Sequence, residues 1–185
     1  MTVANNRNPD RNELAVSINL FDIPAATSAY IDDQVDVKVN RVTGNLQHNE
    51  EGTFTVKVTN APAPNGVRLT EISLHVTVEP TGIVSLKPPG SALLTARATA
   101  DLDDTPLKTT DRVDEMFVFF LASGGDIEPN ATLDVGELLE LELEFEADNP
   151  GTASIKCHIH ASVDPDDLFP RSGGTNGSRD VTVKS

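Results

Sequence analysis

The stretch LLELELEFEADNPGTASIKCHIHASV, residues 138–163, decides the fold. On both sides of DNPG, apolar and polar side chains alternate, as they do along a strand that has one face against a core. The four residues Asp148 to Gly151 are of the kinds that favour a tight turn. The stretch therefore predicts two antiparallel strands joined as a hairpin. The residues predicted to face inward are Leu139, Leu141, Leu143, Phe145, Ala147, Ile155, Cys157, Ile159 and Ala161.

The same two-residue period recurs along the chain and predicts further strands. No segment keeps the 3.6-residue helical period over three turns, so we expect very little helix. Residues 113–121, VDEMFVFFL, are apolar on both faces and are expected to lie deep. Apart from the first stretch, the alternating segments lie near residues 14–20, 35–39, 54–58, 67–78, 83–86, 94–100 and 180–183.

One of these segments changes phase. In VRLTEISLHVTV, residues 67–78, the apolar positions are first odd, as at Leu69, and then even, from Ile72 onward. An extra residue in one strand of an antiparallel pair produces such a change. We therefore expect a β-bulge near Thr70 and Glu71.

About ten short strands separated by Gly, Pro, Asn and Asp predict an all-β protein. The expected architecture is an immunoglobulin-like or jelly-roll β-sandwich with extended N- and C-terminal arms. We place the sandwich domain at residues 13–164, after an extended N-terminal arm at 1–12. Residues 165–185 are expected to form a C-terminal loop and a short edge strand.

The charge excludes several classes of function. Twenty-nine acidic and 14 basic residues give a net charge of −15 over 185 residues. Binding to nucleic acid or to an anionic membrane surface needs a basic footprint that is missing here. No apolar run approaches the length of a membrane span, and the single cysteine cannot close an intrachain disulfide. The acidic balance resembles that of proteins from halophilic organisms and their viruses, whose surfaces work in concentrated salt.

The segments 52–78 and 133–163 resemble bacterial and archaeal immunoglobulin-like modules. The first contains TVKVTN followed by a loop and a longer strand, and the second contains LDVGE and PGT. This resemblance implies an immunoglobulin-like sandwich and says almost nothing about function.

Residues 144–163, with FEADNPGTASIKCHIHASV, also resemble the copper hairpin of cupredoxins and multicopper oxidases. The resemblance implies a copper site that uses Cys157 and His158, with His160 nearby. The family pattern is incomplete, because Lys156 replaces the preceding histidine and Ser162 stands where a second ligand is expected. No methionine follows Met116, so the usual weak axial ligand is also missing.

Alternation places Cys157 inward and the two histidines outward, where solvated imidazoles are the simplest interpretation. His75 lies on the outward face of its own strand and could complete a surface site only if the two strands are neighbours. A row of glutamates marks another outward face, and it lies in water, faces Lys or Arg on adjacent strands, or meets a cation or a basic partner. The row consists of Glu140, Glu142, Glu144 and Glu146.

Two acidic loops carry clustered carboxylates of the kind that calcium prefers, although neither has the spacing of a known calcium-binding loop. No nucleophile elbow, phosphate-binding glycine loop or HExxH motif is present, so we do not expect an enzyme. The candidate calcium ligands are Asp101, Asp103 and Asp104 in one loop and Asp164, Asp166 and Asp167 in the other.

The leading functional hypothesis is therefore a non-enzymatic structural or assembly subunit without a cofactor. Its expected partners are copies of itself or other subunits, for example of a virion, a capsid decoration or a surface filament. Main-chain pairing is expected at the edge strands 82–87 and 180–184. The sequence shows no secretory signal, so a virion, an extracellular assembly or the cytoplasm are the expected locations. The alternatives are a calcium-, glycan- or protein-binding module and a cupredoxin-like copper protein.

Overall fold

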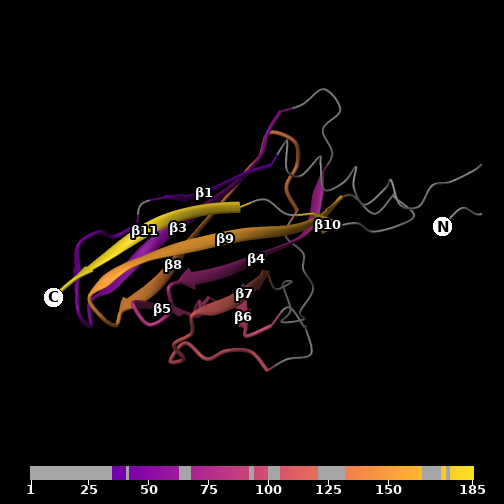
Figure 1. Ribbon diagram of the computed structural model, residues 1–185. Helices are drawn as coiled ribbons and strands as arrows, with labels where there is room; N and C mark the ends of the chain where they lie inside the picture. Colours follow the sequence, from indigo (N-terminus) through magenta and orange to yellow (C-terminus); the bar gives the residue numbers. More distant parts are fainter. Residues whose placement is uncertain are drawn as a thin grey trace, which may run out of the picture.

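The computed structural model describes residues 35–40, 42–62, 68–91, 94–99, 105–120, 132–163, 172–173 and 176–185. These residues form strands and connecting loops and contain no helix, so the all-β prediction is confirmed (Figure 1). The expected arm 1–12 and the expected strand 14–20 lie outside the described residues. The strands are β1 (Val35–Asn40), β2 (Leu46–Gln47), β3 (Glu51–Asn60), β4 (Leu69–Glu79), β5 (Val84–Lys87), β6 (Leu94–Arg97), β7 (Glu115–Phe120), β8 (Leu138–Ala147), β9 (Gly151–Val163), β10 (Ser172–Gly173) and β11 (Asn176–Lys184).

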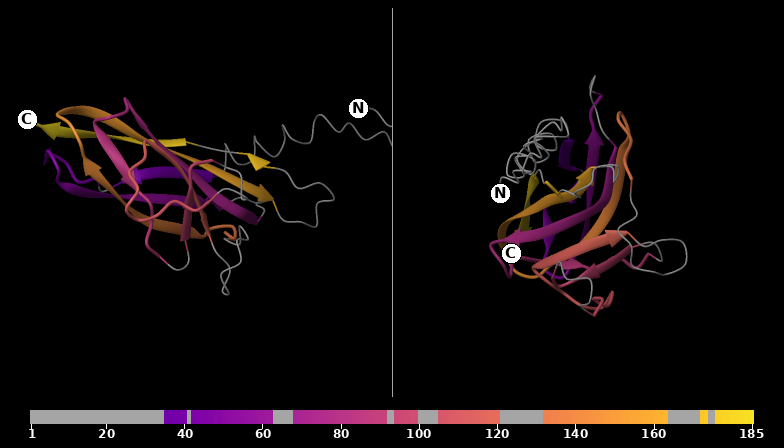
Figure 2. Two further views of the ribbon diagram at one scale, coloured as in Figure 1. Left: turned by 90° about the horizontal axis from the view of Figure 1, so that it is seen from below. Right: turned by 90° about the vertical axis from the view of Figure 1, so that its right-hand side faces the viewer.

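The strands form two packed sheets, which the two views of Figure 2 show from the side and from one end. The smaller sheet has the order β1-β3-β8-β5, and the larger has the order β2-β11-β9-β4-β7-β6, with β10 also paired to β9. A constant-type immunoglobulin sandwich has the same arrangement, with strands A, B, E and D facing C, F and G. Here β6 and β7 extend the larger sheet beyond β4. The immunoglobulin-like alternative therefore describes this topology.

The core fills the space between the two inner faces. The predicted inward residues of β1, β3 and β9 are buried, and so is the end of β8 from Leu143 to Ala147. Leu139 and Leu141 are only partly buried, so the core is less covered at the start of β8. The rings of Phe54 and Phe145 meet between the central strands of the smaller sheet, with centroids 6.2 Å apart.

The expected β-bulge in β4 is confirmed. The register between β4 and β9 shifts between Thr70 and Ser73. Leu69 and Ile72 are both fully buried, although one is odd and the other even. The extra residue therefore keeps two differently phased apolar sets on the same core face.

The predicted hairpin at residues 138–163 is wrong, because β8 and β9 belong to different sheets. The turn between them crosses the sandwich from one sheet to the other. Its amides at Asp148 and Asn149 both donate to the carbonyl of Ile83, at 2.9 and 3.2 Å. Gly151 has φ +152°, and a Cβ there would lie 2.7 Å from Cδ1 of Ile83. The turn is therefore anchored to the connection between β4 and β5.

The C-terminal strand is longer than expected. We predicted a short edge strand near residues 180–183, but β11 begins at Asn176, inside the glycine-rich stretch that was expected to be a loop. Eight of its residues pair with β9, from Asn176 opposite His158 to Val183 opposite Gly151. β2 pairs in parallel with the last two positions, at Val183 and Lys184.

One side of the sandwich is covered by the segment 105–114. The amide of Leu107 donates to the carbonyl of Ala96 in β6, at 2.8 Å. The amide of Leu86 in β5 donates to the carbonyl of Val113, also at 2.8 Å. β5 is an edge strand of the smaller sheet, as expected for residues 82–87. The segment 105–114 already occupies part of this edge through the pairing of Leu86 with Val113.

Candidate functional site

The structure places the proposed copper ligands on opposite sides of β9. Cys157 is fully buried in the core, and this burial raises the pKa of its thiol to about 12. His158 and His160 project from the other face of the same strand and are partly exposed. The thiol and the two imidazoles are therefore not brought together.

The two histidines instead have a third histidine on the neighbouring strand. β4 and β9 are neighbours, and His75 lies directly opposite His158, while Ser73 lies opposite His160. The rings of His158 and His160 approach edge to face, with centroids 4.6 Å apart. A shared surface site requires β4 and β9 to be neighbours, and they are.

His75 is held by neighbours on β7. Its Nε2 lies 2.6 Å from Oε1 of Glu115, and its ring stacks on Phe117 with centroids 4.2 Å apart and planes within 6°. Both contacts hold the imidazole against side chains of β7. The ring is thus oriented by a carboxylate and an aromatic face together.

The pKa of His160 lies below the ordinary value for histidine. Burial lowers its pKa, and the positive charges of His158 and His75 lower it further. Each of these effects disfavours the imidazolium, through desolvation or through repulsion by like charge. His160 is therefore neutral over a wider pH range than an ordinary histidine.

Arg97 was not singled out from the sequence, although it lies in the same row of the larger sheet. It is the cross-strand neighbour of Phe117, which in turn lies opposite His75. Its side chain is only 2% exposed, and its Nε has no hydrogen-bond partner among the described residues. Phe119 on this outer face is also buried. Arg97 occupies a polar position of an alternating segment, and such a position is predicted to be exposed. The sequence therefore did not indicate that Arg97 is buried.

The glutamate row on β8 faces cations from three other segments. Glu140 pairs with Lys57 at 2.6 Å, and Glu144 pairs with Lys87 at 3.0 Å. Glu146 pairs with Arg112 at 2.7 Å. Glu142 has no ion pair within the described ranges. The row therefore belongs to a partly neutralised surface.

Lys87 links two carboxylates across the smaller sheet. Its Nζ lies 2.7 Å from Glu51 as well as near Glu144. Hydrogen bonds to both carboxylates raise the pKa of Lys87, and the hydrogen bond from Lys87 lowers the pKa of Glu51. These groups are near water, so the network contributes little to stability and is weakened by salt.

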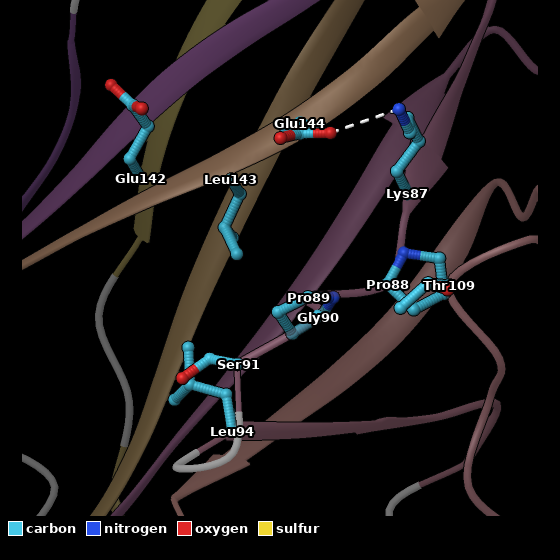
Figure 3. Close-up of a pocket in the computed structure, with 10 residues that line it drawn as sticks. All are labelled: Lys87, Pro88, Pro89, Gly90, Ser91, Leu94, Thr109, Glu142, Leu143 and Glu144. Carbon is cyan, nitrogen blue, oxygen red and sulfur yellow. Dashed lines mark ion pairs between the residues drawn. The ribbon is translucent and has the colours of Figure 1, made fainter.

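A groove lies beside β8, where β5 leaves it. β5 pairs with β8 only from Glu144 to Ala147, and the chain then turns away through Pro88, Pro89 and Gly90. The cavity between this loop and β8 has a volume of about 440 Å³. Figure 3 shows Leu143 pointing from β8 toward the loop and Leu94, with the Lys87–Glu144 ion pair at the rim. In the sequence, Pro88, Pro89 and Gly90 directly after a very short strand indicated that the strand ends early beside β8.

Other predicted sites lie outside the described residues. All six aspartates proposed as calcium ligands fall there, so both loops remain predictions. Within the described ranges, no group of three or more His, Cys, Asp or Glu side chains is arranged to hold a metal ion. Those ranges also contain no helix of the length and hydrophobicity needed to cross a bilayer.

Comparisons with known proteins give a likeness in architecture only. No protein-family model matches the chain. No curated protein matches it either.

Several solved structures are similar at low levels. A ScaB type I cohesin from Pseudobacteroides cellulosolvens has a TM-score of 0.42 and 16% identity, covering 82% of this chain and 93% of that one. Domains D2 and D3 of the major pilin SpaD from Corynebacterium diphtheriae give 0.46 and 12%, covering 78% and 50%. AvmM, which catalyses macrocyclization in alchivemycin A biosynthesis, gives 0.42 and 12%, covering 83% and 90%. A cohesin, two pilin domains and an enzyme thus occur together, and no function follows for this chain.

Proposed function

We propose that this chain is a structural subunit that joins a larger assembly by accepting an extended segment beside β8. The observation that supports this proposal is the mismatch between β8 and its edge neighbour. β8 has ten residues, whereas β5 pairs with only the last four. From Leu138 to Leu143, no described strand pairs with β8 on this side. An added strand would continue the sheet where β5 stops.

The gap has the chemistry of an incomplete core. Leu139 and Leu141 are only partly buried, and Leu138 is 52% exposed. Leu94 is also partly buried and lines the adjoining groove. A strand that presents an apolar side chain at every second residue would cover Leu139, Leu141 and Leu94, which face the core side, whereas Leu138 lies on the opposite face of β8.

The proposed occupant is residues 14–20 of a neighbouring copy. This segment carries Leu14, Val16, Ile18 and Leu20 on one face of an extended chain. Residues 21–34 separate it from β1, and fully extended they span on the order of 45 Å. That length is sufficient for the segment to reach a second subunit.

The test is the mass of the full chain in solution, measured by light scattering after size exclusion over a range of concentrations and salt. Self-association is expected and should increase with salt, because screening reduces the repulsion between subunits of charge −15. The double variant V16D/I18D should remain monomeric, since it places charges on the apolar face. The matched control S17D/N19D adds the same charge to the opposite face and should assemble like the wild type.

Two results would overturn this proposal. One is a monomer at every concentration and salt tried. The other is equal assembly by V16D/I18D and S17D/N19D, because the apolar face of the segment would then play no part.

Within this class we favour a component of a virus particle, such as a capsid decoration, turret or tail-associated protein, working at high salt. The acidic surface supports the preference, because molar salt shortens the Debye length to about 3 Å and permits such surfaces to approach. Mass spectrometry of purified particles from the source culture tests this placement. Finding the chain only in cell lysate or as free secreted protein would contradict it.

A further inference from the structure

Three of the four histidines lie together on the outer face of the larger sheet. His158 and His160 are two residues apart in β9, and His75 is the cross-strand neighbour of His158. The fourth, His48, lies in an exposed turn after β2. This clustering is unrelated to the groove beside β8, which lies against the smaller sheet.

We propose that His158 and His160 form a two-imidazole chelate for a divalent late transition-metal ion, with Zn²⁺ as the test ligand. Side chains at positions i and i+2 of a strand leave the same face about 6–7 Å apart at their bases. Their rings have already converged to a centroid separation of 4.6 Å. Imidazole nitrogens bind Zn²⁺ at about 2.0–2.1 Å, so rotation of the two side chains brings both nitrogens to one ion.

The chelate has two protein ligands, and water completes the coordination. The described residues hold no ready-made group of three or more ligands. His75 stays outside the set because Glu115 and Phe117 hold its ring over β7. Cys157 stays outside because it is buried on the core face.

The charged groups around the pair are paired with one another. A metal ion binds the neutral imidazole, so protons compete with it at low pH. The facing groups are His75 and Glu115 on the β4 and β7 side, and Lys156 and Glu79 along the strands. Lys156 and Glu79 form an ion pair with each other, so neither presents an uncompensated charge to the site.

The experiment is a calorimetric titration of the full chain with Zn²⁺ at pH 7.5 and pH 5.5. One site is expected at pH 7.5, with weaker binding at pH 5.5, where protons compete for the imidazoles. The variants H158Q and H160Q should each weaken binding at least about tenfold, since loss of even an indirect partner costs 10–100-fold. H48Q is the matched control and should bind like the wild type.

A second measurement keeps the test decisive if a variant fails to fold. Zn²⁺ should shift the side-chain ¹⁵N resonances of His158 and His160 in the wild-type chain and leave those of His48 in place. The proposal is overturned if the wild type binds no Zn²⁺ or if H158Q and H160Q bind as tightly as the wild type. Shifts confined to other residues would overturn it as well.

Discussion

Gly177 of β11 lies directly against the main-chain carbonyl of Val37 in β1. A Cβ built on Gly177 would be 2.6 Å from that carbonyl oxygen and 3.1 Å from its carbon. β1 is an edge strand of the smaller sheet, β11 lies next to the short edge strand β2 of the larger sheet, and β1 and β11 lie side by side in Figure 1. The absence of a side chain at Gly177 therefore sets how closely the two sheets meet on this side of the sandwich.

Replacing Gly177 by alanine should lower the free energy of unfolding by about 1–3 kcal/mol, the usual range for overpacking. The obstructing atoms belong to the backbone of β1, which cannot rotate away as a side chain would. Urea unfolding of both proteins measures the difference. Gly44→Ala is the control, because a Cβ at Gly44 meets nothing within 4 Å. Equal losses in the two variants would contradict the close contact.

The thiol of Cys157 should react very slowly with a thiol reagent in the folded protein. Burial raises its pKa from 9.0 to about 12, which reduces the thiolate fraction at pH 8 about a thousandfold. Unfolding in urea should restore the ordinary reaction rate. The assay is the release of chromophore from an aromatic disulfide reagent, with and without urea. Fast reaction of the folded chain would show that the thiol is accessible.

The raised pKa of the Cys157 thiol makes the free energy of unfolding depend on pH in the alkaline range. Above pH 9 the unfolded chain releases the thiol proton while the folded chain retains it until about pH 12. The unfolded state then binds fewer protons, so the free energy of unfolding falls as pH rises through this window. Urea unfolding at pH 8 and pH 10 should show a smaller decrease in Cys157→Ala than in the wild type. An identical decrease in both would contradict the assignment.

His160 should make the fold less stable in acid. Its pKa is lower in the folded protein than the ordinary value of 6.5, so the unfolded state binds more protons as pH falls below 6.5. Stability is therefore full above that pH and is lost as pH falls through the folded pKa. In urea unfolding at pH 7.5 and pH 5, His160→Gln should lose less stability than the wild type. His48→Gln should behave like the wild type.

Arg97 should be replaceable by methionine with no loss of stability and a gain of up to about 1 kcal/mol. Its buried Nε lacks a hydrogen-bond partner among the described residues. An unsatisfied buried donor costs about 1–3 kcal/mol, and a similarly sized apolar side chain removes that cost. Thermal and urea unfolding measure the effect. A loss above about 2 kcal/mol would show that the guanidinium has a stabilising partner beyond the described ranges.

Much of the fold could be predicted because alternation reports which side of a strand faces the core. The bulge at Thr70 was visible as a change of phase, since an inserted residue must leave that trace. Alternation does not report which sheet a strand joins. The turn from Asp148 to Gly151 has the same residues whether it closes a hairpin or crosses between sheets. The contact with Ile83 that decides the matter is distant in sequence.

The candidate sites were predicted less completely than the fold. The outward direction of His158 and His160 followed from alternation, but the position of His75 opposite His158 depends on the pairing of β4 with β9. The burial of Arg97 was invisible for a similar reason, because its neighbours come from elsewhere in the chain. The polar start of β11, from Asn176 to Asp180, is ordered by its pairing with β9, and its own residues show no apolar alternation.

The parallel pairing of β2 with the end of β11 has a consequence for biosynthesis. Leu46 lies opposite Val183, so β2 cannot pair with β11 until the end of β11 has been synthesised. Residues 151–158 of β9 likewise have no neighbour on one side until residues 176–183 have emerged from the ribosome. The larger sheet can therefore be completed only after β11 has been translated. A nascent chain halted before residue 176 would leave residues 151–158 of β9 open to chaperones and to other nascent chains.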